Sequence, residues 1–316
     1  MPEAARVGDH HTCPCPTPQA HVGGPIEPPC SPDVETNGRP QARATDQLTC
    51  TGVGLRNFIV TGSPTVVING KMAARRTDYT MHAPPGMIVA GSPDVVIGGG
   101  RAGATLGDPA AGQRACVAAR AGRDPPAGAL SPSGAQLQPN TDGQSYNNCG
   151  VESVRQIINQ VDPANAQTQE ELLNHAMANG NATSVPGNLH ASGGTLPQQR
   201  VNILTDHGVG ATQVAPTMDN LQQHVGLGRG VTADVWAARF WPADVVTGSG
   251  MVPGTNAGGH SILVTGVEFD AQGNLENVIV NDTGTGDCSR SVPAAQFEGA
   301  LIGGGNNHVV TDDPIW

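Results

Sequence analysis

Three polar positions in the carboxy-terminal half combine the side-chain types that nucleophilic catalysis needs. Cys149 stands at the start of a predicted helix, where free backbone N–H groups and the helix dipole favour a thiolate. His260 precedes a predicted strand, so it can act as the base for that thiol. The next strand ends in Asn281 and Asp282, and either can accept a hydrogen bond from the imidazole. Gln144, five residues before the cysteine, can donate to a developing oxyanion.

Each of these residues has a plainer interpretation when taken alone. A cysteine at a helix start is usually structural, and a histidine beside glycines is usually solvated. Their order and their places on a helix start, a strand start and a strand end together favour catalysis. Cys116 and Cys288 lack such a setting and are interpreted as incidental. We expect the aromatic cluster of Trp236, Phe240 and Trp241 in the core rather than along a substrate groove.

The first hundred residues supply a second group of reactive side chains, suited to binding a metal ion. His21, Cys50 and His82 each lie ten or thirteen residues before one of three similar Ser-Pro elements. An insertion near the amino terminus adds His11 and Cys13, either of which can provide a fourth ligand. Imidazole and thiolate in a closed tetrahedral set select zinc. The pattern therefore predicts one zinc site that joins three segments.

The segments that carry these ligands recur along the chain. Residues 4–9 return with changes as residues 41–46 and again as residues 73–78. The Ser-Pro elements begin at Ser31, Ser63 and Ser92. Their β-branched residues and Gly-containing turns indicate short strands. Repeats at such a period indicate units that can bury their strands only against one another.

These strings resemble those of PAAR-repeat proteins over residues 1 to about 100. They are Ala-Ala-Arg-Val-Gly-Asp from residue 4, His-Val-Gly-Gly-Pro-Ile from residue 21 and Gly-Ser-Pro-Thr-Val-Val-Ile-Asn-Gly from residue 62. The resemblance implies an all-β cone of three repeats with structural zinc near its tip. It also implies that the cone caps the VgrG spike trimer of a type VI secretion apparatus. The family's three His and one Cys correspond here to His11, His21, Cys50 and His82, with Cys13 competing for the place of His11.

The rest of the chain divides into a linker and a second domain. Residues 101–140 are rich in Gly, Ala and Pro and are predicted to be a linker. From residue 141 we expect helices followed by an antiparallel sheet, which is an α+β domain spanning residues 141–316. The predicted helices begin at Cys149, at Thr168 with a capping box to Glu171, and at about Met218. The predicted strands are 231–237, 262–269 and 278–280, with a hairpin turn at 270–274.

This second domain resembles the papain-like cysteine peptidases, most of all the bacterial branch that includes the peptidase domains of bacteriocin exporters. The strings are Asn-Cys-Gly-Val-Glu-Ser from residue 148 and Gly-His-Ser-Ile-Leu-Val-Thr-Gly from residue 259. The resemblance implies Cys149 as nucleophile, His260 as base, Asp282 as orienting acid and Gln144 at the oxyanion, with no catalytic cofactor. The glutamine stands one residue nearer the cysteine than is usual. Asn281 remains an alternative to Asp282, because adjacent strand residues point in different directions.

Composition excludes several other classes of protein. The 316 residues include 16 Lys and Arg against 27 Asp and Glu, a net charge of −11. That balance argues against nucleic-acid binding, which needs clustered cations. No apolar run is long enough to span a membrane, and the first residues lack the apolar stretch of a secretory signal.

Together these features predict a type VI effector that carries a cysteine protease as cargo. The expected partners are VgrG, a protein substrate in the target bacterium and an immunity protein in the producer. We expect the chain in the producer's cytoplasm and then inside the target cell, in its cytoplasm rather than its periplasm. The alternatives are a papain-like deamidase or acyl transferase, a peptidoglycan amidase toxin, and a non-enzymatic extension of the spike tip.

Overall fold

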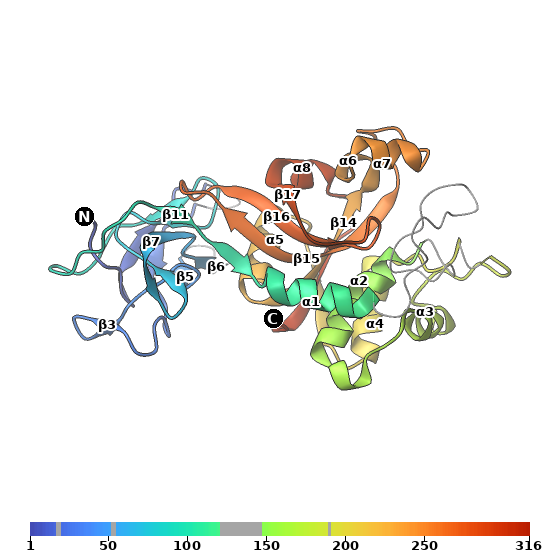
Figure 1. The fold of residues 1–316 in the computed structure, drawn as a ribbon, viewed down its shortest axis with the longest axis horizontal. Coiled ribbons are helices and arrows are strands. Elements are labelled where there is room, and N and C mark those ends of the chain that lie inside the picture. The colour runs from blue at the N-terminus through green and yellow to red at the C-terminus, as the bar shows by residue number, and fades with distance from the viewer. Residues whose placement is uncertain (17–19, 52–54, 121–146, 189–190) are drawn as a thin grey trace. The chain divides into compact units, whose positions relative to one another are not determined.

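The protein forms two compact units, each described here by itself (Figure 1). The structure is a computed structural model, and the residues that it describes are 1–16, 20–51, 55–120, 147–188 and 191–316. The first unit comprises residues 1–106 and 267–277, and the second comprises residues 107–266 and 278–316. Among the residues described, no helix has the length and apolar composition needed to cross a membrane.

The first unit is built from short strands. Their bounds are β1 His10–Thr12, β2 Gly24–Pro25, β3 Glu35–Thr36, β4 Arg39–Pro40, β5 Gln47–Cys50, β6 Leu55–Phe58, β7 Thr61–Ile68, β8 Lys71–Ala73, β9 Tyr79–Thr80, β10 Gly86–Ile88 and β11 Ala102–Gly103. One sheet has the order β2-β1-β10-β9 and another the order β11-β7-β8, while β3 pairs with β4 and β5 pairs with β6. The unit is therefore all-β in its described residues, as the sequence predicts.

Three buried Arg–Asp ion pairs of matching geometry hold this unit together. They are Arg6–Asp9, Arg43–Asp46 and Arg75–Asp78. In each pair the backbone N–H of the arginine donates to the aspartate at 2.8–2.9 Å, and its guanidinium contacts both carboxylate oxygens. Such bidentate contacts satisfy the charges that burial would otherwise leave unpaired.

A ring of backbone hydrogen bonds joins the same three segments. The N–H of Ala5 donates to the carbonyl of Ala74, that of Ala74 to Ala42, and that of Ala42 back to Ala5, at 2.9–3.0 Å. All three alanines are fully buried. Only a side chain as small as alanine lets three backbones approach one point, so the repeated Ala-Arg string has a direct packing role.

Helices cover the second unit. Their bounds are α1 Pro109–Arg120, α2 Cys149–Val161, α3 Gln169–Ala178, α4 Pro197–Asp206, α5 Met218–Gly226, α6 Ala237–Phe240, α7 Ala243–Gly248 and α8 Ala294–Ala300, with a 3₁₀ turn η1 Pro163–Asn165. Helix α2 buries Val151, Val154, Ile157 and Ile158 at helical spacing against Leu172 of α3. The helix that begins at the candidate nucleophile is thus anchored along its whole apolar face.

An antiparallel sheet forms the other layer of this unit. Its strands are β13 Ala211–Val214, β14 Arg229–Trp236, β15 Gly259–Phe269, β16 Leu275–Asp282, β17 Asp287–Pro293 and β18 His308–Pro314. The order is β13-β18-β14-β15-β16-β17, and β12 (Thr105–Gly107) also pairs with β15. In the antiparallel pairing of β14 with β15, His260 lies opposite Val235. Because β16 neighbours β15, its end at Asp282 can meet the start of β15 at His260.

The local elements around the candidate catalytic residues are as predicted. Helix α2 begins at Cys149, and α3 begins after Thr168 with the expected capping box, in which Glu171 N–H donates to Thr168 Oγ1 at 3.2 Å. Helix α5 begins at Met218. Strand β14 covers the first predicted strand as far as Trp236, since Ala237 begins α6, and β15 and β16 cover the other two. The domain is α+β, as its element order predicts.

Part of the predicted linker is ordered. Residues 102–120 form β11, β12 and helix α1, whereas residues 121–146 lie outside the described residues. Helix α1 has an Ala-rich sequence with a weak apolar pattern. Its composition therefore resembles that of a linker, and its periodicity does not indicate a helix. Periodicity and turn residues likewise did not indicate α4, α6, α7, α8, β13, β17 and β18.

Cys116 and Cys288 are not incidental, and this interpretation was wrong. They form a disulfide that joins α1 to β17, with a Cα–Cα distance of 5.8 Å. The two cysteines lie 172 residues apart, so no local spacing pointed to their pairing. The bond closes a long loop within the catalytic half of the chain.

Candidate active site and metal site

Cys149 lies at the amino end of α2, where the side chains of Thr195 and Arg200 pack closely against the next residue, Gly150. A Cβ on Gly150 would lie 2.0 Å from Oγ1 of Thr195 and 3.2 Å from Cδ of Arg200. Glycine is therefore the residue that fits directly after Cys149, because these two side chains pack against the first turn. Asn148, the N-cap, is buried and has no side-chain hydrogen bond among the described residues.

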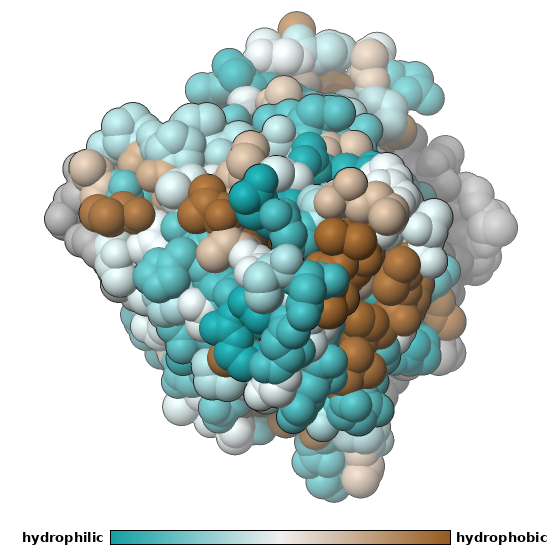
Figure 2. All heavy atoms as spheres, turned by 90° about the vertical axis from the view of Figure 1, so that its left-hand side faces the viewer, coloured by the Kyte–Doolittle hydropathy of each residue, from teal (hydrophilic) through white to brown (hydrophobic). Residues whose placement is uncertain are grey.

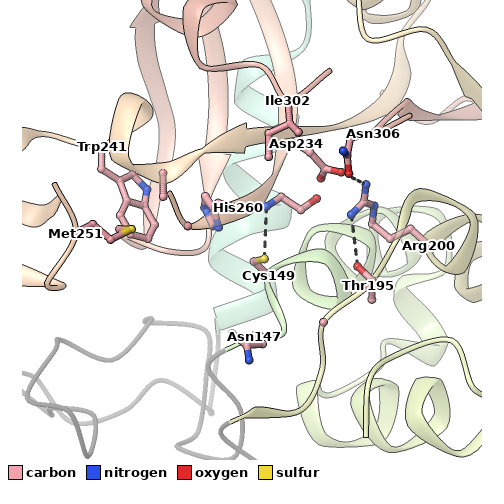
Figure 3. A pocket seen from close by; sticks show the side chains of 15 residues that line it. Asn147, Cys149, Thr195, Arg200, Asp234, Trp241, Met251, His260, Ile302 and Asn306 are labelled. Carbon is pink, nitrogen blue, oxygen red and sulfur yellow. Dashed lines mark hydrogen bonds and ion pairs between the residues drawn. The ribbon is translucent and has the colours of Figure 1, made fainter. Parts of the chain in front are cut away.

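His260 connects the thiol to a carboxylate. Its Nε2 lies 2.7 Å from Oδ1 of Asp282, and its other nitrogen, Nδ1, is left for the sulfur of Cys149, with which the imidazole interacts. The backbone N–H of Ser261 also donates to that sulfur at 3.4 Å, as Figure 3 shows. His260 is 4% exposed, so its ring position is fixed by packing. Cys149, His260 and Asp282, proposed from sequence, thus come together.

Asp282 rather than Asn281 faces the imidazole. Oδ1 of Asp282 also accepts from the N–H of Gly284 at 2.9 Å. Asn281 points the other way, and its amide donates to the carbonyl of Gly112 and to Oε1 of Gln156, each at 2.8 Å. It therefore ties β16 to α1 and to the nucleophile's helix. Adjacent residues of a strand point to opposite faces, which is why only one of the two can reach His260.

Trp241 packs over the His260–Asp282 contact. The indole lies 5.0 Å from the imidazole, centroid to centroid, and its Nε1–H donates to Oδ2 of Asp282 at 3.0 Å. A Cβ on Gly284 would lie 2.2 Å from this indole, so the glycine makes room for it. Phe240 is in the core as expected, but Trp241 lines the catalytic cavity, contrary to the prediction for the cluster. Its polar N–H explains the difference.

The electrostatics of the site favour an ion pair. Burial opposes charge on Cys149, but the hydrogen bond and positive charge of His260 outweigh it and lower the pKa of the thiol. Burial likewise opposes charge on His260, yet Asp282 and Cys149 raise the pKa of the imidazole to about 10. The pKa of Asp282 is lowered despite its burial, by His260 and Arg290. The site thus favours thiolate and imidazolium more strongly than an isolated cysteine and histidine would.

A cavity of about 330 Å³ opens onto the thiol. Trp241 and Met251 line it on one side of Cys149, and Arg200 and Asp234 line it on the other (Figure 3). Arg200 donates to Oδ2 of Asp234 at 2.7 Å, so the two charged side chains on this side of the cavity pair with each other. The cavity is large enough for one or two residues of an extended chain and leaves the sulfur accessible to a substrate carbonyl. Gln144, proposed for the oxyanion, lies outside the described residues.

A second cluster, in the first unit, can hold a metal ion. One ligand atom from each of Cys13, His21, Cys50 and His82 lies within 4.8 Å of the others, and all four residues are buried. Nδ1 of His82 and of His21 lie 3.3 and 3.5 Å from the sulfur of Cys13, and Nδ1 of His21 lies 3.4 Å from that of Cys50. The structure thus brings together three of the proposed ligands with Cys13.

His11 lies beside this cluster but not in it. Its Nδ1 lies 2.9 Å from the carbonyl of Gly24, and its Nε2 lies 3.3 Å from the amide nitrogen of Asn57. Both ring nitrogens therefore already have protein partners. Strand β1 ends at Thr12, and of these two candidates only Cys13, directly after the strand, lies in the cluster.

The donor set fits zinc. Two thiols and two imidazoles in a closed, buried group have the softness and number that Zn²⁺ prefers. Burial raises the pKa of Cys13 to about 12, so without a cation this thiol stays protonated. Burial and the neighbouring His21 and His11 lower the pKa of His82 to about 4, which keeps its lone pair free to coordinate. A divalent cation would supply the charge that two buried thiolates require.

Comparison with known families gives a match for each of two regions of the chain. Residues 133–302, more than half of the chain, match the Peptidase_C39-like family. The chain belongs to the Peptidase_C39-like family. Residues 17–83 match the PAAR motif, so a PAAR region precedes the C39-like domain in one polypeptide. This agrees with the resemblances seen in the sequence.

The comparison with solved structures also gave matches. A crystal structure described as a C39-like peptidase from Bacillus anthracis aligns with 52% of this chain and 88% of that chain, at 17% identity and a TM-score of 0.38. The comparison with curated proteins returned no match.

Two residues that contact Asp282 were not predicted to lie at this site. The sequence favoured a core position for Trp241, and it gave no indication of a role for Arg290. Arg290 on β17 donates from Nη1 to Oδ2 of Asp282 at 3.1 Å. No spacing links residue 290 to residue 282 until β16 and β17 pair, so no signal in the sequence could have shown this contact.

Proposed function

We propose that the protein is a type VI secretion effector whose C39-like unit hydrolyses a peptide bond in a protein of the target bacterium. The roles are Cys149 as nucleophile, His260 as general acid and base, and Asp282 as the group that orients the imidazole. The observation that carries this proposal is the chain of contacts from the half-buried Cys149 through the buried His260 to the buried Asp282, beside an open cavity.

The reaction follows from this geometry. The thiolate of Cys149 attacks the scissile carbonyl carbon and forms a C–S bond, while the carbonyl oxygen becomes an oxyanion. As the C–N bond breaks, Nδ1–H of His260 gives its proton to the leaving amine. A water then attacks the thioester, passes its proton to His260, and the carboxylic acid leaves as the thiolate returns. Asp282 keeps Nε2 protonated throughout, so Nδ1 is always the atom that exchanges the proton.

The oxyanion needs hydrogen-bond donors beside the sulfur. The backbone N–H of Cys149 at the start of α2 is one such group, since the first turn of a helix leaves its N–H groups free. We keep Gln144 as the proposed second donor. Its replacement by alanine should lower kcat by about a hundredfold if it has this role.

We propose that the first unit is a PAAR spike tip of three repeats. The three matching Arg–Asp pairs and the ring of hydrogen bonds through Ala5, Ala42 and Ala74 support this repetition. Zinc bound by Cys13, His21, Cys50 and His82 would cross-link segments that have a small apolar core. In this role the metal is structural and takes no part in the reaction.

An apolar surface supports a spike partner such as VgrG. The face in Figure 2 carries a contiguous group of apolar side chains. The exposed apolar residues of the first unit include Met1, Val67, Val95 and Val96, which are 85%, 60%, 38% and 46% exposed. Exposed groups of this kind mark interaction sites.

We also propose delivery into the target cytoplasm and a producer immunity protein that blocks the catalytic cavity.

The test is to compare the wild-type chain with Cys149→Ala in intoxicated cells and to search by mass spectrometry for new peptide ends. New ends present only with the wild type support a peptidase. A one-dalton gain on Gln, or a new crosslink, would instead indicate a deamidase or an acyl transferase. Toxicity that appears only with an export signal would indicate a peptidoglycan amidase. Equal toxicity of both proteins would leave only a non-enzymatic spike-tip extension.

A further inference from the structure

We propose that Arg290 is a positioning residue of the catalytic site, which holds Asp282 so that one carboxylate oxygen faces His260. This inference rests on the proposed peptidase function and adds to the triad a residue that does not touch the substrate. Arg290 acts through Asp282, and Asp282 acts through the imidazole.

The two oxygens of Asp282 have separate partners. Oδ1 accepts from His260 Nε2 at 2.7 Å and from the N–H of Gly284 at 2.9 Å. Oδ2 accepts from Nη1 of Arg290 at 3.1 Å and from Nε1 of Trp241 at 3.0 Å. Rotation of the carboxylate would break contacts on both oxygens at once. The arginine and the indole therefore fix the orientation in which Oδ1 meets the imidazole.

Arg290 is itself held in place from the side of α6. Its Nη2 donates to the carbonyl of Phe240 at 3.1 Å, and its guanidinium lies 4.8 Å above the ring of the same residue. The Arg290 side chain is 17% exposed, so the ion pair is largely shielded from solvent. A planar guanidinium can make these contacts together, whereas a lysine ammonium would keep the charge but lose the stacking and one hydrogen bond.

The strand that carries Arg290 is tied down just before it. Cys288 is disulfide-bonded to Cys116 of α1. Ser289 donates its N–H to Oδ1 of Asn281 at 3.0 Å and its hydroxyl to the carbonyl of Pro109 at 2.9 Å. These bonds fix the register between β17 and the end of β16. The guanidinium thus approaches Asp282 from an anchored backbone.

The charge of Arg290 also acts on the site. Among the described elements, the charged groups that face Asp282 are His260 on β15 and Arg290 on β17, and Cys149 on α2 faces His260 from its other side. His260 and then Arg290 lower the pKa of Asp282. Loss of the Arg290 charge leaves the carboxyl easier to protonate. Protonation of Asp282 removes the acceptor that holds the imidazolium beside Cys149.

The test uses the full-length chain with Arg290→Met, Arg290→Lys and a control, Arg239→Met. Arg239 lies on α6 next to Phe240, the residue that Arg290 contacts, but it donates to the carbonyl of Gly299 rather than to Asp282. Two pH profiles are recorded for each protein. One is cleavage of a peptide that contains a mapped cleavage site, and the other is alkylation of Cys149 by iodoacetamide, followed by mass spectrometry.

We expect Arg290→Met to lower kcat by about tenfold to a hundredfold, with KM nearly unchanged, because misplaced catalytic groups cost rate rather than binding. The acid limb of both profiles should move up by about one pH unit, the lower end of the effect of one nearby opposite charge. Arg290→Lys should restore the position of the acid limb and part of kcat. Arg239→Met should match the wild type.

Two results would overturn the inference. One is a loss of activity in Arg290→Met with unchanged pH profiles and a lower unfolding temperature, which would show a purely structural role. The other is wild-type behaviour of Arg290→Met in both assays. Alkylation of Cys149 needs no peptide substrate, so it tests the role of Arg290 separately from the proposed peptidase function. Alkylation profiles that shift as expected while no variant and no wild-type protein cleaves any peptide would contradict the peptidase function instead.

Discussion

Nε2 of His260 lies 2.7 Å from Oδ1 of Asp282, and this contact decides which imidazole nitrogen serves the thiol. With Nε2 committed to the carboxylate, Nδ1 is the atom left for the sulfur of Cys149, and in the proposed reaction it is the atom that exchanges the proton. The arrangement is set by two neighbouring strands, since His260 is the second residue of β15 and Asp282 ends β16. Helix α2 supplies the sulfur, whereas the imidazole and the carboxylate belong to the sheet.

Asp282→Asn should lower kcat by a hundredfold or more, because the amide removes the charge that stabilises the imidazolium. The measurement is kcat and KM on a mapped peptide. The matched change is Asn281→Ala, which removes bonds to Gly112, Gln156 and Ser289 but leaves the acid in place. We expect it to lower the free energy of unfolding by about 1–3 kcal/mol, with kcat reduced far less. The reverse pattern would make Asn281 the third member of the triad.

The pH dependence of stability should show the charge on His260. Its pKa is raised from 6.5 to about 10 in the folded protein, so the stabilisation from its positive charge is fully present below about pH 6.5. That stabilisation is lost as the pH rises through about 10. Urea unfolding of wild type and His260→Gln from pH 6 to pH 10 measures it. The advantage of the wild type should shrink steadily with pH, and a constant difference would contradict a raised pKa.

The sequence predicted most of the local structure around the catalytic residues. A helix start at Cys149, a strand start at His260 and a strand end at Asp282 all follow from periodicity and turn residues. The choice between Asn281 and Asp282 did not follow, because it depends on which strand face meets the imidazole. Arg290 and the Cys116–Cys288 bond were not predictable, since each depends on the pairing of elements far apart in the chain.

The metal cluster, too, could be predicted only in part from the sequence. The recurring segments placed His21, Cys50 and His82 at similar positions, and the structure brings their ligand atoms together. The fourth ligand was left open between His11 and Cys13. One residue, Thr12, separates these candidates, and the structure places the ligand atom of the cysteine in the cluster. A pattern of spacing cannot show the direction of a side chain outside a regular element.

Metal content should distinguish the two candidates for the fourth ligand. Cys13→Ser should lose most bound zinc and lower the unfolding temperature of the first unit, because folding and metal binding are coupled in small sites. His11→Ala should keep the zinc, since its nitrogens contact Gly24 and Asn57 instead. Elemental analysis of both purified variants measures this. Peptidase activity should be unchanged in both, and zinc loss only in His11→Ala would contradict the cluster seen here.

Removal of the disulfide should destabilise the catalytic unit. Cys116→Ser together with Cys288→Ser opens a loop closed over a sequence separation of 172 residues, and such a loss costs roughly 2–5 kcal/mol. Urea unfolding followed by circular dichroism measures the change, with Cys30→Ser as a control because Cys30 is a free thiol of the first unit. Treatment of the wild type with a reducing agent should lower its midpoint to that of the double variant. The same treatment should not move the midpoint of the double variant, because Cys149 is the other described thiol of this unit and forms no disulfide. Equal midpoints for the wild type and the double variant under oxidising conditions would show that the bond does not support the fold.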